Sequence, residues 1–159
     1  MAVTLRPLTT ADRELLRTAC VFNINWPGER FTFADLDGYP GLSHYVQLAP
    51  ERGDFGVVAE QGGNCVGVAW LLFLDSSDPG YGYVADGIPE LGITVWTGYR
   101  RKGIGRQMLQ ALIDEARSRG IREISLSVED GNPSVLLYTA FGFKPVPDAP
   151  AEGTYSLPL

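Results

Sequence analysis

The segment 90–128 constrains the fold of this chain more than any other part of the sequence. It contains the extended run ELGITV, a short loop with two glycines, and a stretch over about 103–119 in which apolar residues recur at helical spacing. Gly120 then suits the end of a helix, and IREISLSV follows as a second extended run. A strand, a helix and a strand in succession imply two parallel strands joined by a right-handed crossover. The segment therefore predicts a sheet with helices packed against it.

The flanking segments extend this sheet and add further helices. Additional strands are expected at 2–8, 55–60, 65–74, 143–146 and 154–159. Additional helices are expected at 9–23, 42–48 and 132–142. The sequence QGGN between the second and third strands indicates a tight hairpin turn. We therefore expect an α/β (α+β) fold in a single domain, 1–159, with a mixed, twisted sheet of about seven strands and helices on both faces.

Charge and hydropathy exclude several classes of protein. A net charge of −6 disfavours a nucleic-acid-binding protein, because neutralising phosphates requires a cationic surface. No run of apolar residues approaches the roughly 18 that a membrane-spanning helix requires. The first residues, MAVTLRPLTTADRELL, lack the basic region and apolar run of a secretory signal. We therefore expect a cytoplasmic protein with no nucleic-acid or membrane partner.

The potential metal ligands are few and widely spaced. Cys20 and Cys65 have no metal-like or redox-like spacing, and His44 is the only histidine. We expect reduced, partly buried thiols, a histidine at the surface or in a substrate cleft, and no metal site.

The loop between the central strand and the following helix has the chemistry of an anion site. Backbone N–H groups at a helix start have no partner within the helix, and the helix dipole adds positive charge there. Gly103 and Gly105 bring no Cβ atoms that would hold an anion away from these donors, and four of the seven residues in 100–106 are basic. The loop is therefore a candidate pyrophosphate site, and the alternative explanation of its glycines is a structural turn.

Two nucleotide-binding motifs are excluded in detail. A P-loop requires GxxxxGK followed by Ser or Thr, and the sequence has neither. A dinucleotide fingerprint requires a third glycine where Met108 stands.

Two blocks of the sequence resemble the GCN5-related N-acetyltransferase (GNAT) family. The block ELGITVWTGYRRKGIGRQML resembles the central motif of that family, with Arg100, Gly103 and Gly105 at the matching positions. The block LSVEDGNPSVLLYTAFGF resembles its second signature, and its matching residues are Asn132, Tyr138 and Gly142–Phe143. The two blocks occur in the expected order, and the resemblance covers essentially the whole chain.

The resemblance implies acetyl-CoA as co-substrate, bound where the strands at 90–96 and 123–129 splay apart. In such a protein, main-chain groups of the central strand pair with the pantetheine arm, the loop amides hold the pyrophosphate, Asn132 lies along the arm and Tyr138 lies near the sulfur. The implied cofactor-binding residues are Ile93, Thr94, Val95, Arg100, Arg101, Lys102, Gly103, Ile104, Gly105, Arg106, Asn132 and Tyr138.

Transfer of an acyl group to an amine by direct attack requires a base and an acid. Tyr138 is the candidate general acid because a phenol is protonated at neutral pH, and its alternative role is packing. Glu90, on the strand face opposite Leu91, is the candidate general base, and its alternative is an exposed carboxylate at a strand start. Asp86 and Glu29 are less favoured bases. A backbone N–H of the splayed strand, at Ile93, is the expected oxyanion donor.

The acceptor is expected to be a primary amine on a small molecule or at a protein N-terminus or lysine. Segments 23–50 and 75–89 are expected to shape its site, and the candidate substrate-binding residues are Trp26, Glu29, Tyr83 and Asp86. A homodimer is a reasonable expectation. Two other functions stay open: an acyl-CoA-binding sensor without catalysis, and a phosphate-binding enzyme of another fold.

Overall fold

The computed structural model describes residues 2–159 and contains a seven-stranded sheet in the order β1-β2-β3-β4-β5-β7-β6. The strands are β1 (Thr4–Pro7), β2 (Phe55–Gln61), β3 (Asn64–Leu72), β4 (Glu90–Val95), β5 (Glu123–Ser127), β6 (Lys144–Pro145) and β7 (Thr154–Pro158). Only the β4–β5 pair is parallel, and the other neighbours are antiparallel. The mixed sheet predicted from the sequence is confirmed.

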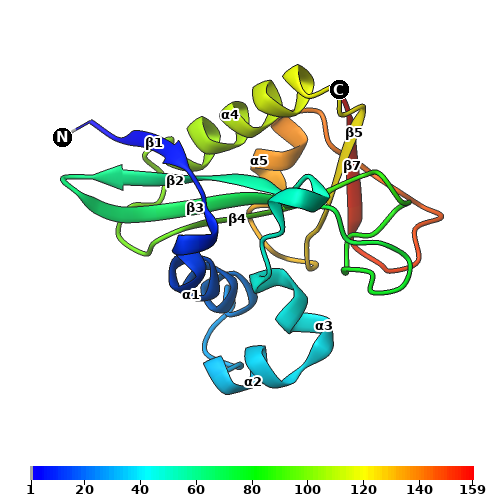
Figure 1. The fold of residues 1–159 in the computed structure, drawn as a ribbon, viewed down its shortest axis with the longest axis horizontal. Helices are drawn as coiled ribbons and strands as arrows, with labels where there is room; N and C mark the ends of the chain where they lie inside the picture. The colour runs from blue at the N-terminus through cyan, green and yellow to red at the C-terminus, as the bar shows by residue number, and fades with distance from the viewer. Residues whose placement is uncertain (1) are drawn as a thin grey trace.

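Helices cover both faces of this sheet, as predicted. The helices are α1 (Arg13–Ile24), α2 (Phe33–Gly38), α3 (Pro40–Ser43), α4 (Ile104–Ser118) and α5 (Val135–Ala140), with short 3₁₀ turns η1 (Thr10–Asp12), η2 (His44–Val46) and η3 (Pro50–Arg52). Helices α4 and α5 lie on one side of the sheet, and α1, α2 and α3 lie on the other (Figure 1).

Two apolar cores separate these layers. Met108, Leu109 and Leu112 of α4 are fully buried against one face of the sheet, together with Leu91 of β4. The other core lies beneath α1 and includes Leu16 and Trp70. Because side chains alternate along a strand, β4 directs its odd-numbered residues to the first core and its even-numbered residues, beginning with Glu90, toward α1.

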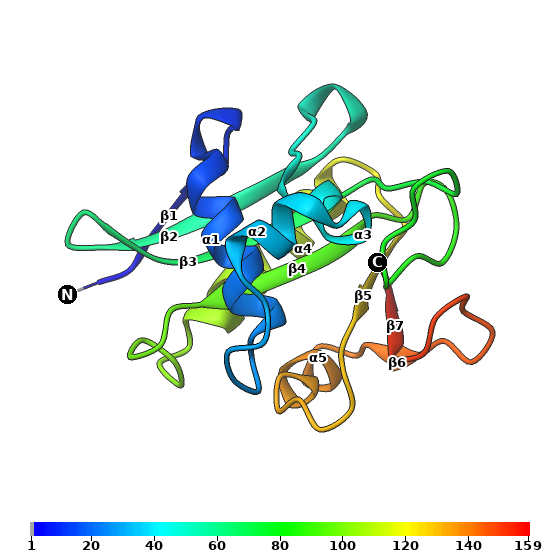
Figure 2. The same ribbon diagram turned by 90° about the horizontal axis from the view of Figure 1, so that it is seen from below.

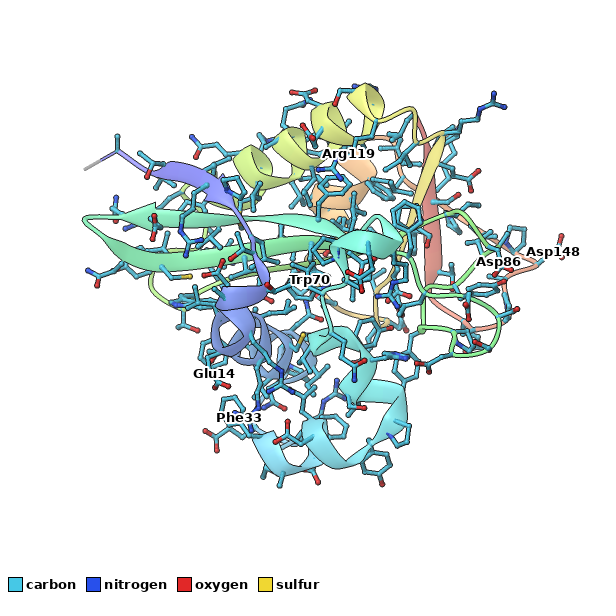
Figure 3. The ribbon with its side chains drawn as sticks, viewed as in Figure 1. Glu14, Phe33, Trp70, Asp86, Arg119 and Asp148 are labelled. Atoms are coloured by element: carbon cyan, nitrogen blue, oxygen red, sulfur yellow. The ribbon has the colours of Figure 1, made fainter. Side chains whose placement is uncertain are left out.

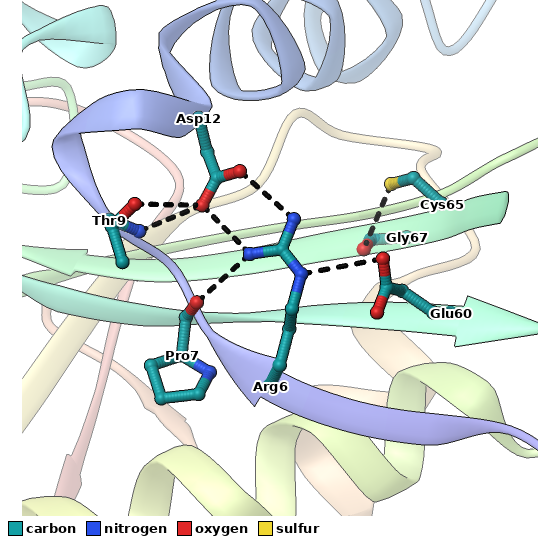
Figure 4. A network of polar contacts seen from close by, with 7 residues as sticks. All are labelled: Arg6, Pro7, Thr9, Asp12, Glu60, Cys65 and Gly67. Carbon is teal, nitrogen blue, oxygen red and sulfur yellow. Dashed lines mark hydrogen bonds and ion pairs between the residues drawn. The ribbon is translucent and has the colours of Figure 1, made fainter. Parts of the chain in front are cut away.

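An ion-pair network joins β1 to the start of α1 and to β2 (Figure 4). The Arg6 guanidinium donates to both carboxylate oxygens of Asp12 at 2.9 Å and lies 3.3 Å from Glu60. The bond from Arg6 holds the pKa of Asp12 below its usual range. Asp12 also accepts the Thr9 amide at 2.9 Å, which fixes the turn before α1.

The sequence predicts only one helix in residues 25–50, at 42–48. The structure has α2 as well, and α3 and η2 stand where that single helix was expected. The helix α2 begins with a reciprocal cap, in which Asp35 N donates to Thr32 Oγ1 at 3.1 Å and Thr32 N donates to Asp35 Oδ2 at 2.8 Å. Pro40 then provides the first residue of α3, since a proline at a helix start loses no hydrogen bond. The chain therefore makes short helical turns here in place of one helix.

Within residues 2–159, no helix is both long enough and apolar enough to span a bilayer.

Candidate active site

The central strands β4 and β5 are paired only at one end. The pairing covers Glu90 with Ser125 and Leu91 with Leu126, and the strands diverge beyond it (Figure 2). The predicted splayed strand pair is therefore present. Between the diverging ends, one edge of β4 faces a gap in the sheet.

The backbone of β4 shows which of its polar groups face this gap. Trp96 N donates to Val66 O at 2.8 Å, across to the segment that contains β3. Because backbone groups alternate along a strand, Thr94 also turns toward β3, and Ile93 and Val95 turn toward the gap. Two side chains bind the carbonyls that face the gap: Asn23 Nδ2 donates to Ile93 O at 2.9 Å, and Arg100 Nε donates to Val95 O at 3.2 Å.

Thr94 is directed away from the gap in both its backbone and its side chain. It is buried, its Cα partner on β3 is Val68, and its hydroxyl donates to Ala19 O at 2.9 Å. Of the three strand residues expected to bind the cofactor arm, the structure places only Ile93 and Val95 at the gap.

The loop after β4 presents unpaired amides at the start of α4. Gly103 caps the helix with φ of 81°, a left-handed conformation that favours glycine. The first helical bond is donated by Gln107 N to Gly103 O at 3.0 Å. Within residues 2–159, the amides of Ile104, Gly105 and Arg106 have no backbone acceptor. These three donors point out of the helix start, as an anion site requires.

The basic side chains around these amides are not neutralised. Across residues 2–159 no carboxylate forms an ion pair with Arg100, Arg101, Lys102 or Arg106. Lys102 lies over the ring of Tyr99 at 5.7 Å, and Arg106 lies over the ring of Phe141 at 5.3 Å. Four cationic groups near the helix start therefore have no carboxylate partner among residues 2–159, and their charge can attract an anionic ligand.

A cavity of about 380 Å³ lies between the splayed strands, the C-terminal part of α1 and the segment that follows α1. Both β4 and β5 contribute to its wall. Its lining includes Asn23, Trp26, Arg30, Tyr45, Trp70, Tyr81, Glu90, Leu91, Gly92, Ser127, Val128, Glu129, Asn132, Tyr138 and Glu152. The two predicted catalytic residues, Glu90 and Tyr138, thus face one space, and Asn132 lines it as well.

Glu90 is buried rather than exposed at its strand start. The residue is 6% exposed, and its Oε1 accepts a hydrogen bond from the amide of Gly82 at 2.7 Å. The hydroxyl of Tyr45 lies beside this carboxyl. Burial raises the pKa of Glu90 to about 7, although the neighbouring Tyr45 hydroxyl and the Gly82 amide oppose that rise. A carboxyl with this pKa can exchange a proton near neutral pH.

Tyr138 lines the same cavity from α5. It packs edge-on against Phe143 with ring centroids 5.8 Å apart, and the residue is 6% exposed. Burial raises the pKa of its phenol, so the group is protonated at neutral pH. The side chain therefore both packs in the core and presents a proton donor.

The candidate acceptor-site residues are divided between two places. Trp26 lines the cavity, whereas Glu29 is exposed outside its wall. The Tyr83 hydroxyl donates to Asp86 at 2.7 Å, and Tyr83 lines a separate hollow. Figure 3 places Asp86 at the edge of the molecule, away from Trp70 of the cavity wall. The structure thus joins Trp26 to Glu90 and leaves the other three residues elsewhere.

The sequence analysis does not identify several residues of the cavity wall, because they come from segments that are distant from one another along the chain. Arg30 forms an ion pair with Glu129, 99 positions away, and this bond lowers the pKa of Glu129. Tyr45 reaches Glu90 from η2. No local pattern marks these pairs. The one usable signal was the Thr32–Asp35 cap, which would have revealed α2 beside the cavity.

Of the remaining polar candidates, Cys20 lines this cavity and the others do not. His44 is buried and its Nδ1 lies 2.8 Å from Asp78, so it is neither at the surface nor in the cavity wall. Cys20 and Cys65 are free thiols, as predicted. Residues 2–159 contain no cluster of three His, Cys, Asp or Glu side chains that could hold a metal ion.

A profile described as the acetyltransferase (GNAT) family matches residues 19–143. The alanine N-acetyltransferase of ribosomal protein bS18 from Escherichia coli K12 is 38% identical over 61 residues, covering 38% of this chain and 41% of that protein. An L-methionine sulfoximine/L-methionine sulfone acetyltransferase from Pseudomonas aeruginosa is 39% identical over 59 residues, covering 36% of this chain and 34% of that protein. These matches span less than half the length of either curated relative.

Solved structures share the fold over nearly the whole chain. A GNAT acetyltransferase from Staphylococcus aureus superposes with a TM-score of 0.74 at 20% identity, covering 99% of both chains. The PaiA N-acetyltransferase from Thermoplasma acidophilum, solved with coenzyme A, gives 0.69 at 18% identity and covers 100% of both chains. A putative acetyltransferase from Salmonella typhimurium, solved with acetyl-CoA, gives 0.71 at 22% identity, covering 100% of this chain and 95% of that one.

Proposed function

The chain belongs to the acetyltransferase (GNAT) family, and from this premise we propose that it transfers an acetyl group from acetyl-CoA to a primary amine. The observation that carries the proposal is the position of Glu90 and Tyr138 on the wall of one cavity, which opens between the splayed strands. A base and an acid for the same reaction must both reach the reacting atoms.

The residues at the gap and at the start of α4 fit the CoA moiety of the substrate. In this proposal the pyrophosphate accepts hydrogen bonds from the amides of residues 104–106. Gly103 shapes the turn before them, and the basic residues of 100–106 add positive charge. The pantetheine arm pairs with main-chain groups of Ile93 and Val95, and Asn132 lies along it. Thr94 acts only by holding β4 in place.

Proton transfer is assigned to two residues of the cavity. Glu90 removes a proton from the ammonium form of the acceptor, which then attacks the thioester directly. A pKa of about 7 leaves a useful fraction of Glu90 ionised at neutral pH. Tyr138 donates its phenolic proton to the departing sulfur, and the Ile93 N–H donates to the oxyanion. No step requires a covalent bond to the enzyme.

The charges of the cavity favour a cationic acceptor. Its wall contains three carboxylates, those of Glu90, Glu129 and Glu152, and one guanidinium, that of Arg30. The acceptor is an amine on a small molecule or at a protein N-terminus or lysine, and the two relatives named above represent both kinds of substrate. In this proposal 1–159 acts as one cytoplasmic domain without a nucleic-acid, membrane or metal partner, and a homodimer is compatible with it.

The proposal is tested by measuring thiol release from acetyl-CoA across a panel of amines, beside calorimetric binding of CoA. We expect micromolar to millimolar CoA affinity together with turnover on at least one amine. CoA binding without turnover on any amine would overturn the enzyme assignment in favour of a sensor. Thermal protection by ATP or NAD but not by CoA would favour a phosphate-binding enzyme of another kind.

A further inference from the structure

Two groups flank the Glu90 carboxyl, one from the segment that directly precedes β4 and one from η2. Gly82 N donates to its Oε1 at 2.7 Å. The Tyr45 hydroxyl lies beside the same carboxyl, since a Cβ atom on Gly80 would lie 2.3 Å from Glu90 Oε1 and 2.7 Å from the Tyr45 oxygen. The hydroxyl also accepts the amide of Tyr81 at 2.8 Å. Since a phenol has one proton and the Tyr81 amide already donates to its oxygen, that proton is free for the Glu90 carboxylate.

The segment that supplies these amides is fixed in turn by the sheet. Ser125 Oγ of β5 donates to Gly82 O at 2.6 Å, and Thr154 Oγ1 of β7 donates to Tyr81 O at 3.3 Å. A Cβ atom on Gly82 would lie 2.6 Å from the Leu126 carbonyl carbon, so only glycine lets the segment approach β5 this closely.

The ring of Tyr45 is held from its other sides. It contacts His44 edge-on at 4.5 Å and stacks with Tyr81 at 6.5 Å with an interplanar angle of 10°. Both rings and the bond from the Tyr81 amide therefore restrict its rotation and keep the hydroxyl beside Glu90.

We propose that Tyr45 is a positioning residue for the general base: its hydroxyl, which lies beside Glu90, donates to that carboxyl and holds it at the wall of the acceptor cavity. This inference rests on the proposed function, in which Glu90 is the base. Tyr45 itself need not touch the amine or the thioester. It acts by favouring the ionised, correctly oriented form of the carboxyl.

The direction in which Tyr45 shifts the pKa of Glu90 follows from the negative charge of the Glu90 carboxylate, which accepts the hydrogen bond. A hydrogen bond donated to a carboxylate stabilises the ionised form and lowers its pKa, against the rise that burial causes. Removal of the hydroxyl therefore raises the pKa of Glu90. The other titratable groups on the cavity wall are Cys20, Arg30, Tyr81, Glu129, Tyr138 and Glu152, and Tyr45→Phe leaves all of them in place.

The experiment is a ¹³C NMR titration of protein labelled at the glutamate side-chain carboxyl carbon. The Glu90 signal is assigned by its absence in Glu90→Gln, and its midpoint in the unaltered protein is expected at about 7. Tyr45→Phe should raise that midpoint by about one pH unit, as loss of one charge-assisted bond implies. The acid limb of kcat/KM should move by the same amount, and the rates should converge well above both midpoints.

Two further variants complete the test. Tyr39→Phe changes an exposed tyrosine between α2 and α3 and should leave the midpoint unchanged. Tyr45→3-fluorotyrosine keeps the ring and makes the hydroxyl a stronger donor, so it should lower the midpoint even where Tyr45→Phe does not fold.

The outcomes separate this inference from the proposed function. An unchanged Glu90 midpoint in folded Tyr45→Phe, with kcat/KM reduced equally at every pH, would overturn the positioning role. A shifted midpoint would support it. If Glu90→Gln kept full turnover while the Tyr45 variants still moved the midpoint, the base assignment alone would fail.

Discussion

The two halves of the candidate site are built in different ways. The half at the start of α4 consists of consecutive residues, and its donors are backbone amides that belong to any helix start. The half around Glu90 is assembled from η2, the 75–89 segment, β4 and β5, through side-chain contacts across 36 and 43 positions. The first half depends on local conformation, and the second depends on tertiary packing.

This difference suggests a division of labour that can be measured. A local site can bind a constant ligand, here the CoA moiety, with little regard to the rest of the fold. A site assembled over long range can differ in its acceptor while the cofactor half stays the same. Variants in the Glu90 half should therefore change turnover and pH dependence, and variants in the α4 half should change CoA affinity.

The largest effect is expected for Glu90→Gln. Removal of a general base typically lowers turnover by about 10²–10⁴-fold, and CoA affinity should stay unchanged because Glu90 faces the acceptor cavity. Steady-state rates and calorimetry on the same preparation measure both quantities. Glu123→Gln, at the start of β5 and outside the cavity wall, is the matched control. Equal losses in turnover and CoA affinity would break the division between the two halves.

Tyr138→Phe should come next, with turnover reduced by roughly 10–10³-fold. The ring and its contact with Phe143 remain, so the fold and CoA affinity should be retained. Tyr155→Phe on β7 removes a hydroxyl outside the cavity wall and provides the control for rate assays. Full turnover in Tyr138→Phe would leave that residue with a packing role only.

Glu90 should also reduce the stability of the fold at neutral pH. Its pKa is raised from 4.5 to about 7 by burial, so the folded state holds a proton that the unfolded state loses between these values. The free energy of unfolding should therefore fall as pH rises through this window, by about 3 kcal/mol at most. Urea unfolding from pH 4 to 8 should show this fall in the unaltered protein and not in Glu90→Gln. Parallel curves for the two proteins would contradict the assigned burial.

The smallest effect is expected for Gly103→Val, which should weaken CoA binding by about tenfold. A Cβ atom there would meet nothing within 4 Å, so the cause is the φ of 81° that a β-branched residue resists. Gly63 has the same φ of 81° and equally open surroundings in the β2–β3 turn, so Gly63→Val separates backbone strain from loss of binding. The acid limb of kcat/KM should not move in either variant.

The local half was readable from the sequence for physical reasons. Gly103 and Gly105, with the basic residues around them, indicate an anion site at a helix start, and the alternation of ELGITV predicts that Glu90 lies on the strand face opposite Leu91. The burial of Glu90 was not readable, because it depends on Gly82 and Tyr45 reaching it from other elements. Tyr83 and Asp86 were predicted at the acceptor site from their segment alone, yet the fold turns that part of the segment outward.

The side chains on the β4 edge have a consequence for how the gap persists. Asn23 and Arg100 satisfy the carbonyls of Ile93 and Val95, which would otherwise be free to extend the parallel ladder with β5. The gap in the sheet is therefore maintained by side chains of the protein itself. Binding of the thioester would then replace the bonds from Asn23 and Arg100 to these carbonyls by bonds from the ligand. The backbone of β4 and β5 should therefore have the same conformation with and without the ligand.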